Sequence, residues 1–160
     1  MNDLIGRIHS YDILNCLYPG CLFSIFCDSN IQLHIFDLYN KSIIIAIVFC
    51  YFIGMVIDRI GSFFIEKLLH IPFIDFQFSS YEDFIKAKKS DAEIGILSEK
   101  NNIYRNMTAF FLITIADTWI YSEGSECTYI FYVIMLVLFF SSYIKQSKYI
   151  VKRVNEVVGH

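Results

Sequence analysis

The chain has 160 residues, which is enough for one domain, and 56% of them are hydrophobic while only 18% are charged. Soluble domains are closer to half apolar and a quarter charged, so this composition and a mean hydropathy of +0.49 favour a membrane protein. The formal net charge of −3 provides no general basic field, which argues against direct binding of nucleic acid.

Four apolar segments predict the fold class. A membrane-spanning helix needs about 20 mostly apolar residues. The segments that approach this length are residues 11–27, 41–59, 105–122 and 127–145. The sequence therefore predicts an all-α protein: a four-helix transmembrane bundle in a single membrane domain. A small helical cytoplasmic loop at 68–103 and a cytoplasmic helical tail at 146–160 complete the prediction.

The distribution of basic residues predicts the orientation. If both termini are cytoplasmic, all 13 Lys and Arg residues except Lys41 fall on the cytoplasmic side. The segments left outside, 28–40 and 123–126, are short, and we expect them to be acidic loops. The sequence thus favours a multi-pass membrane protein with both termini in the cytoplasm, in contact with membrane lipid.

The first span carries a polar seam of Asp12, Asn15, Cys16 and Pro19. Proline has no backbone N–H, so Pro19 frees a carbonyl that a neighbour must satisfy. The seam is interpreted as helix packing, with pore lining as the alternative. At the outer end of this span, the sequence leaves open whether Cys27 forms a disulfide with Cys127.

The second span ends in an Asp-Arg pair among apolar residues. Asp58 and Arg59 are adjacent, so they point about 100° apart and need partners elsewhere. Asp12 and Arg105 lie at the same expected depth. We therefore predict a structural charge cluster at the cytoplasmic edge, in which Asp12 pairs with Arg59 and Asp58 with Arg105.

The third span contains an ionisable residue. Thr114, Asp117 and Thr118 share one helical face, and a carboxylate within a span is a functional hypothesis by default. A proton or ion path is one interpretation. The other is a hydrated or hydrogen-bonded side chain near the outer surface.

The loop before the third span carries more apolar residues than a free loop should expose. We expect a short helix after Ser80, the same capping spacing again at Ser90 and Glu93, and an N-cap at Ser98 for the helix that runs into the third span. Such a loop is too small for a core of its own and needs a surface to bury against. The predicted partner-docking residues are Phe73, Phe76, Phe78, Phe84, Lys86, Lys88 and Lys89.

The sequence contains no recognisable catalytic motif. It has no Gly-rich phosphate loop, no nucleophile elbow, no paired catalytic carboxylates and no Cys/His spacing typical of metal ligands. We therefore expect a protein that is not an enzyme and that holds no cofactor or metal.

The stretches "YDILN", "GMVIDRIGSFFIEKLL", "YEDFIKAKKSDAEI" and "NNIYRN" resemble small four-helix bacterial membrane proteins of anti-phage defence loci. The Kiwa membrane subunits (KwaA) are the nearest such family. The resemblance spans about residues 10–107 and includes no catalytic motif. It implies an inner-membrane homo-oligomer, a tetramer, that senses phage and holds a cytosolic DNA-binding effector of the KwaB kind.

Two functions follow as hypotheses. The first is an oligomeric inner-membrane scaffold or sensor whose cytoplasmic loop recruits an effector protein. The alternative is a channel or pore-forming membrane effector, which would depend on Asp117 and on the polar seam of the first span.

Overall fold

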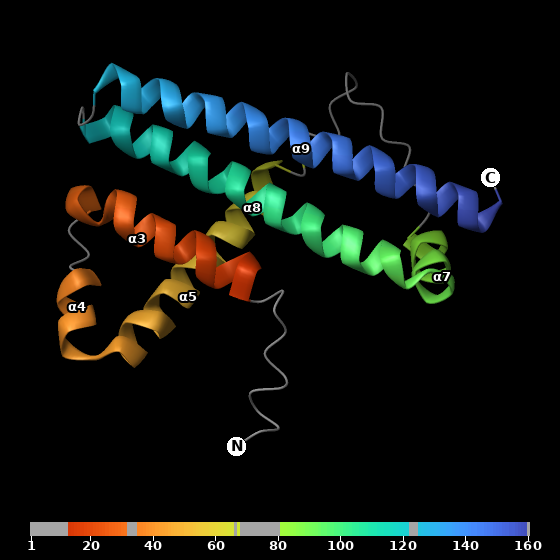
Figure 1. Cartoon of the computed structure of the whole chain (residues 1–160), viewed down its shortest axis with the longest axis horizontal. Coiled ribbons are helices and arrows are strands. Elements are labelled where there is room, and N and C mark those ends of the chain that lie inside the picture. The colour runs from red at the N-terminus through yellow and green to blue at the C-terminus, as the bar shows by residue number, and fades with distance from the viewer. Residues whose placement is uncertain (1–12, 32–34, 66, 68–80, 122–124, 160) are drawn as a thin grey trace.

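The computed structural model describes residues 13–31, 35–65, 67, 81–121 and 125–159, and these are all-helical (Figure 1). In chain order the elements are the π-helical turn η1 (Ile13–Leu17), α3 (Tyr18–Ile31), α4 (Ile35–Lys41), α5 (Ile43–Ile60), the π-helical turn η2 (Gly61–Ile65), α7 (Tyr81–Ser90), α8 (Ala92–Tyr121) and α9 (Glu126–Val158).

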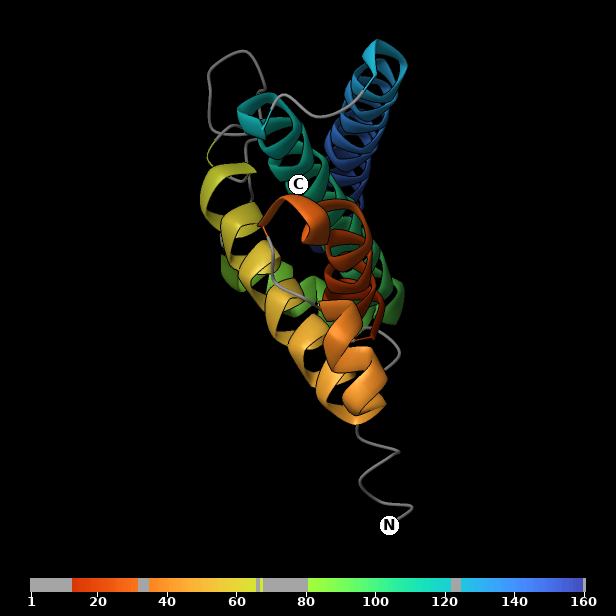
Figure 2. The same cartoon turned by 90° about the vertical axis from the view of Figure 1, so that its left-hand side faces the viewer.

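Helices α8 and α9 form a long antiparallel hairpin that organises the molecule (Figures 1 and 2). The side chain of Ser125 accepts a hydrogen bond from the backbone N–H of Thr128 and so caps the start of α9. The helix ends at Gly159, whose φ of 83° lies in the left-handed region that glycine tolerates best. At about 1.5 Å per residue, the 33 residues of α9 extend for about 50 Å.

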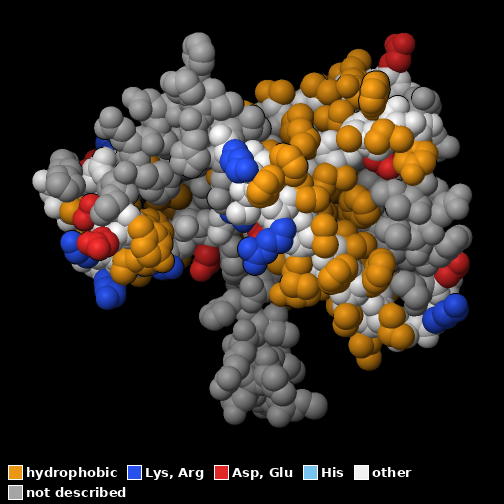
Figure 3. Space-filling model, turned by 180° about the vertical axis from the view of Figure 1, so that it is seen from behind, with side chains coloured by type: hydrophobic (Ala, Val, Ile, Leu, Met, Phe, Trp, Pro, Cys, Tyr) orange, Lys and Arg blue, Asp and Glu red, His pale blue; other side chains and the backbone are white. Residues whose placement is uncertain are grey.

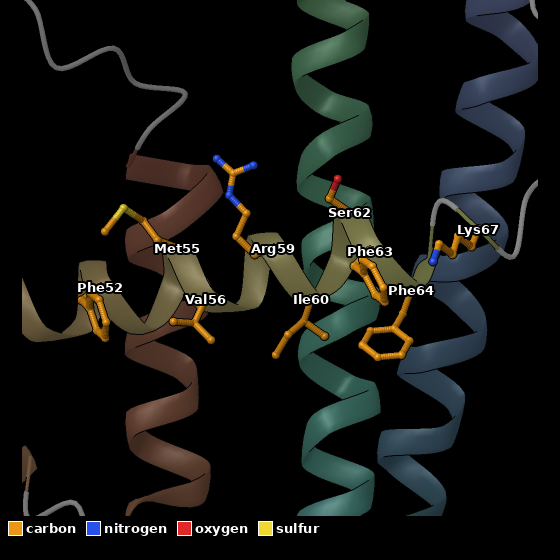
Figure 4. A pocket seen from close by; sticks show the side chains of 9 residues that line it. All are labelled: Phe52, Met55, Val56, Arg59, Ile60, Ser62, Phe63, Phe64 and Lys67. Atoms are coloured by element: carbon orange, nitrogen blue, oxygen red, sulfur yellow. The ribbon is translucent and has the colours of Figure 1, made fainter.

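Helix α3 lies beside α8, whereas α5 crosses over both of them (Figures 1 and 4). Glycines allow the backbones of α3 and α5 to approach closely. A Cβ placed on Gly54 would lie 1.7 Å from the carbonyl oxygen of Cys16, and one on Gly20 would lie 1.8 Å from that of Cys50. The two helices therefore meet backbone to backbone, as small residues permit in membrane proteins.

Two separate clusters of buried side chains hold the helices together. The larger joins α3, α5, α8 and the first half of α9, with Phe110 fully buried at its centre. The smaller lies at the other end of the hairpin, where α7 packs on the start of α8 and the end of α9. Its buried members are Ala87, Ile94, Leu97, Ile150 and Val154.

The all-α prediction is confirmed for the described residues, while the finer prediction of a four-helix transmembrane bundle is not. Among the described residues, two helical stretches are long and apolar enough to cross a membrane, Ile43–Ile65 and Glu126–Val158. The apolar helix Asn15–Phe26 is shorter. The crossing of α5 over α8 also differs from the side-by-side packing of a simple bundle (Figure 4).

Two local expectations were wrong. The segment 28–40 was expected to be a loop, but α4 forms at its end, with Asp37 in its first turn and Lys41 in its last, where each charge complements the helix dipole. Ser98 was expected to start a helix, but it lies inside α8. That helix begins at Ala92, because Asp91 accepts a hydrogen bond from the backbone N–H of Glu93 at 3.0 Å.

We predict that Gly54→Ala destabilises the protein strongly, because its Cβ has no room beside the Cys16 carbonyl. Overpacking of this kind costs about 1–3 kcal/mol or more. Gly95→Ala is the matched control, since the nearest atom to its Cβ is the flexible Lys88 Cε at 3.1 Å. Thermal unfolding in mild detergent should show a lower midpoint for Gly54→Ala alone; equal midpoints for the two variants would contradict the close approach.

Candidate functional site: a polar junction and a charged clamp

A network of polar side chains lies at the point where η1, α5 and α8 meet. Asp58 Oδ1 accepts hydrogen bonds from Arg105 Nη2 at 2.7 Å, Asn106 Nδ2 at 2.9 Å and Asn15 Nδ2 at 3.3 Å. Asn106 is fully buried, and Asn15 and Arg105 are 4% and 8% exposed. We call Asn15, Asp58, Arg105 and Asn106 the polar junction.

Proline chemistry explains why Asn106 is needed there. Pro19 has no N–H to donate to the carbonyl four residues earlier, which is that of Asn15. Asn106 Nδ2 lies 2.9 Å from this carbonyl oxygen and also 2.9 Å from Asn15 Oδ1. The backbone group that Pro19 frees is thus satisfied from α8, as the sequence required.

The junction contains one of the two ion pairs expected from the sequence. Asp58 and Arg105 form it, with side chains that are 18% and 9% exposed. The expected pair of Asp12 with Arg59 cannot be placed in the same way, since Asp12 lies outside the described residues. Arg59 itself is exposed on the outer side of α5, away from the junction (Figure 4).

The other polar residues expected within the spans are buried between helices or form hydrogen bonds to the backbone of their own helix. Cys16 and Pro19 are buried with Asn15 between α3 and its neighbours. Thr114 Oγ1 donates to the Phe110 carbonyl, and Thr118 Oγ1 donates to the Thr114 carbonyl. Asp117 is 6% exposed. The hydroxyls beside Asp117 therefore bond to α8 itself.

A second group of charges, which we call the clamp, ties the start of α8 to the end of α9. Arg153 Nε lies 2.6 Å from Asp91 Oδ2, and Arg153 Nη2 lies 2.5 Å from Glu93 Oε2. The hydrogen bond from Arg153 holds the pKa of the Asp91 carboxyl below its usual value, and the backbone N–H of Glu93 acts in the same direction. The clamp adjoins the smaller core.

The predicted docking residues fall partly within the described chain. Lys86, Lys88 and Lys89 are exposed on α7, and Lys86 lies 3.8 Å from Asp83. Phe84 packs against the smaller core. Phe73, Phe76 and Phe78 lie outside the described residues, and so does the side chain of Cys27, while Cys127 is an exposed free cysteine.

Sequence reasoning missed Asn106 and the clamp. The signal for Asn106 was present, because a buried amide next to Arg105 offers the donor that the Asn15 carbonyl lacks. No comparable signal links Asp91 to Arg153, which are 62 residues apart. Among the described residues, no group of His, Cys, Asp and Glu is arranged to hold a metal ion.

Comparison with known proteins finds no family model, no curated protein and no solved structure that matches the chain.

Breaking the junction should be more damaging than removing it. Asp58→Leu or Arg105→Met leaves one buried charge without its partner, and each single change should cost about 3–5 kcal/mol. The double variant should lose less than the sum of the two, because neither charge remains. The measurement is the unfolding free energy in detergent, and the control is the exposed pair Lys152–Glu156, for which we expect little coupling. Additive losses at Asp58 and Arg105 would contradict the pairing.

The clamp should open in acid. Since folding lowers the pKa of Asp91, its stabilisation is complete above the unfolded value of about 3.9 and is lost as the pH falls through the lower folded value. Hydrogen exchange in α7 should therefore accelerate, beyond the intrinsic pH effect, between about pH 4 and the folded pKa. Asp91→Asn should show fast exchange at neutral pH as well. Glu156→Gln is the control, and α7 protection that Asp91→Asn leaves unchanged would argue against the clamp.

Proposed function

We propose that the chain is an oligomeric scaffold or sensor of the bacterial inner membrane, and that it recruits a cytosolic effector protein, in anti-phage defence. The observation that carries this proposal is the division of the surface between the two ends of the molecule. Hydrophobic side chains cover one end, and charged side chains gather at the other, around α7 (Figure 3).

The apolar end has the surface of a lipid-embedded protein. On α5, Ile44, Val48 and Phe52 are 71%, 64% and 56% exposed, and on α9 Ile134 and Val137 are 57% and 61% exposed. Soluble monomers rarely expose continuous apolar patches of this extent. Lipid, or lipid together with further copies of the chain, would cover them. The tetramer itself is implied by the resemblance to defence proteins.

The charged end has the properties of a cytoplasmic platform. The smaller core and the clamp fix α7 against the hairpin, so its exposed face is held in a defined position. Lys86, Lys88 and Lys89 lie on that helix, which has acidic residues in its first turn and lysines in its last. A partner with an acidic surface is the complement of the lysine end.

A channel has less support. It would need Asp117 to face a water path, yet Asp117 is 6% exposed and the hydroxyls of Thr114 and Thr118 bond to carbonyls of α8.

The decisive test combines membrane extraction with purification in mild detergent. We expect the protein to resist alkaline extraction and to purify as several copies with a stoichiometric cytosolic protein. Reversing the three charges (Lys86→Glu, Lys88→Glu, Lys89→Glu) should release that protein and leave the oligomer in the membrane. The matched control keeps the charges (Lys86→Arg, Lys88→Arg, Lys89→Arg) and should retain the partner. A partner-free ring from the wild type, or a partner that survives charge reversal, would contradict recruitment by α7.

A further inference from the structure

A groove of about 910 Å³ runs along the outer face of α5 and η2 (Figure 4). Its walls are mainly apolar, with Phe52, Val56 and Ile60 on one side and Phe63 and Phe64 toward its end. Among the described residues that line it, Arg59 and Lys67 are the charged ones. The groove therefore combines an apolar trough with two cations.

Neither cation is neutralised by a carboxylate in the part of the chain that the structure describes. Arg59 is exposed there without an ion pair, and Lys67 Nζ lies 3.8 Å from the centre of the Phe63 ring. Asp58 does not compensate Arg59, although it is adjacent in sequence, because its carboxylate is bound by Arg105 and Asn106 on the inner side of α5. The groove thus presents two positive charges to an external ligand.

The position of the two cations along α5 matches a lipid headgroup region. Arg59 lies 16 residues after Ile43, or about 24 Å along the helix, and Lys67 lies about 12 Å further on. The hydrocarbon core of a bilayer is about 30 Å thick. If α5 spans the bilayer, as the proposed membrane function requires, Arg59 and Lys67 lie at the cytoplasmic headgroups while Phe52 and Val56 lie among the acyl chains.

We propose that this groove binds an anionic phospholipid, with its headgroup at the end that carries Arg59 and Lys67 and an acyl chain along Phe52, Val56 and Ile60. Anionic headgroups supply the charge that the two cations lack, and basic sites on the cytoplasmic side of membrane proteins bind such headgroups. The zwitterionic lipid phosphatidylethanolamine carries an ammonium group beside its phosphate, so its headgroup has no net negative charge to offset the two cations. The groove is therefore expected to select lipids by the charge of their headgroup and to accept acyl chains of different kinds.

The test counts lipids bound to the intact protein. The wild type would be reconstituted in nanodiscs of phosphatidylethanolamine with phosphatidylglycerol or cardiolipin, then released and weighed by native mass spectrometry. We expect anionic lipid to be retained in preference to phosphatidylethanolamine. The double variant Arg59→Gln with Lys67→Gln should weaken that retention roughly ten-fold or more, since each basic residue near a membrane surface strengthens the binding of anionic lipid.

Two controls separate the groove from general charge and from folding. Lys41→Gln with Lys148→Gln removes the same charge from exposed positions outside the groove and should keep the wild-type preference. The double variant Arg59→Lys with Lys67→Arg keeps both positive charges in the groove and should also keep the preference for anionic lipid. The proposal is overturned if the wild type shows no preference for anionic lipid, or if the Gln variant retains it fully. It is also overturned if the Gln variant changes only the number of protein copies, because the groove would then be a subunit contact.

Alkaline extraction of membranes from cells that express the same variants distinguishes this proposal from the function on which it depends. Protein released from the membrane would count against the membrane scaffold itself. Protein that stays in the membrane but binds lipids without preference would remove the lipid site and leave the scaffold intact.

Discussion

Three hydrogen-bond donors from two other helical segments meet at one carboxylate oxygen of Asp58, and the geometry of the apolar end depends on that meeting. One of the donors, Asn15, comes from the segment that Gly20 and Gly54 hold against α5, backbone to backbone, while Arg105 and Asn106 come from α8. Pro19 then leaves the Asn15 carbonyl to be satisfied by Asn106 of α8. Since a buried polar group without a partner costs about 1–3 kcal/mol, each member of the junction fixes the position of the others.

Two packed regions that differ in their contacts lie at the two ends of the α8–α9 hairpin. At one end, apolar packing around Phe110 and the junction holds α3 and α5; at the other, a small core and the Arg153 clamp hold α7. Between them, Asn101 donates to Ser147, and its own carbonyl oxygen is buried without a hydrogen bond. The contact between α8 and α9 therefore has a polar stretch at Asn101 and Ser147, which separates the larger apolar core from the smaller one.

Sequence patterns predicted those features that depend on composition and depth. Apolar run length gave the helical class, and equal depth along neighbouring spans paired Asp58 with Arg105, which the structure places 2.7 Å apart. Depth could not give the direction in which α5 crosses α3, because that direction depends on the close contacts of Gly20 and Gly54, one on each helix. The clamp could not be predicted either, since Asp91 and Arg153 look like ordinary surface charges in the sequence and only the packing of α9 on α8 brings them together.

The length of α9 has a mechanical consequence. Its sequence contains neither Gly nor Pro from Glu126 to Val158, so the usual causes of a sharp kink are absent from the helix. Such a helix behaves as a lever about 50 Å long, and a tilt of about 5° at its apolar end would displace the clamp by about 4 Å. The Leu138 carbonyl accepts hydroxyl hydrogen bonds from Ser141 and Ser142, and hydrogen bonds of this kind favour a bend in a helix. If the apolar end lies in a bilayer, as the proposed function requires, a change in bilayer thickness or curvature would move α7 without any local unfolding between the two ends.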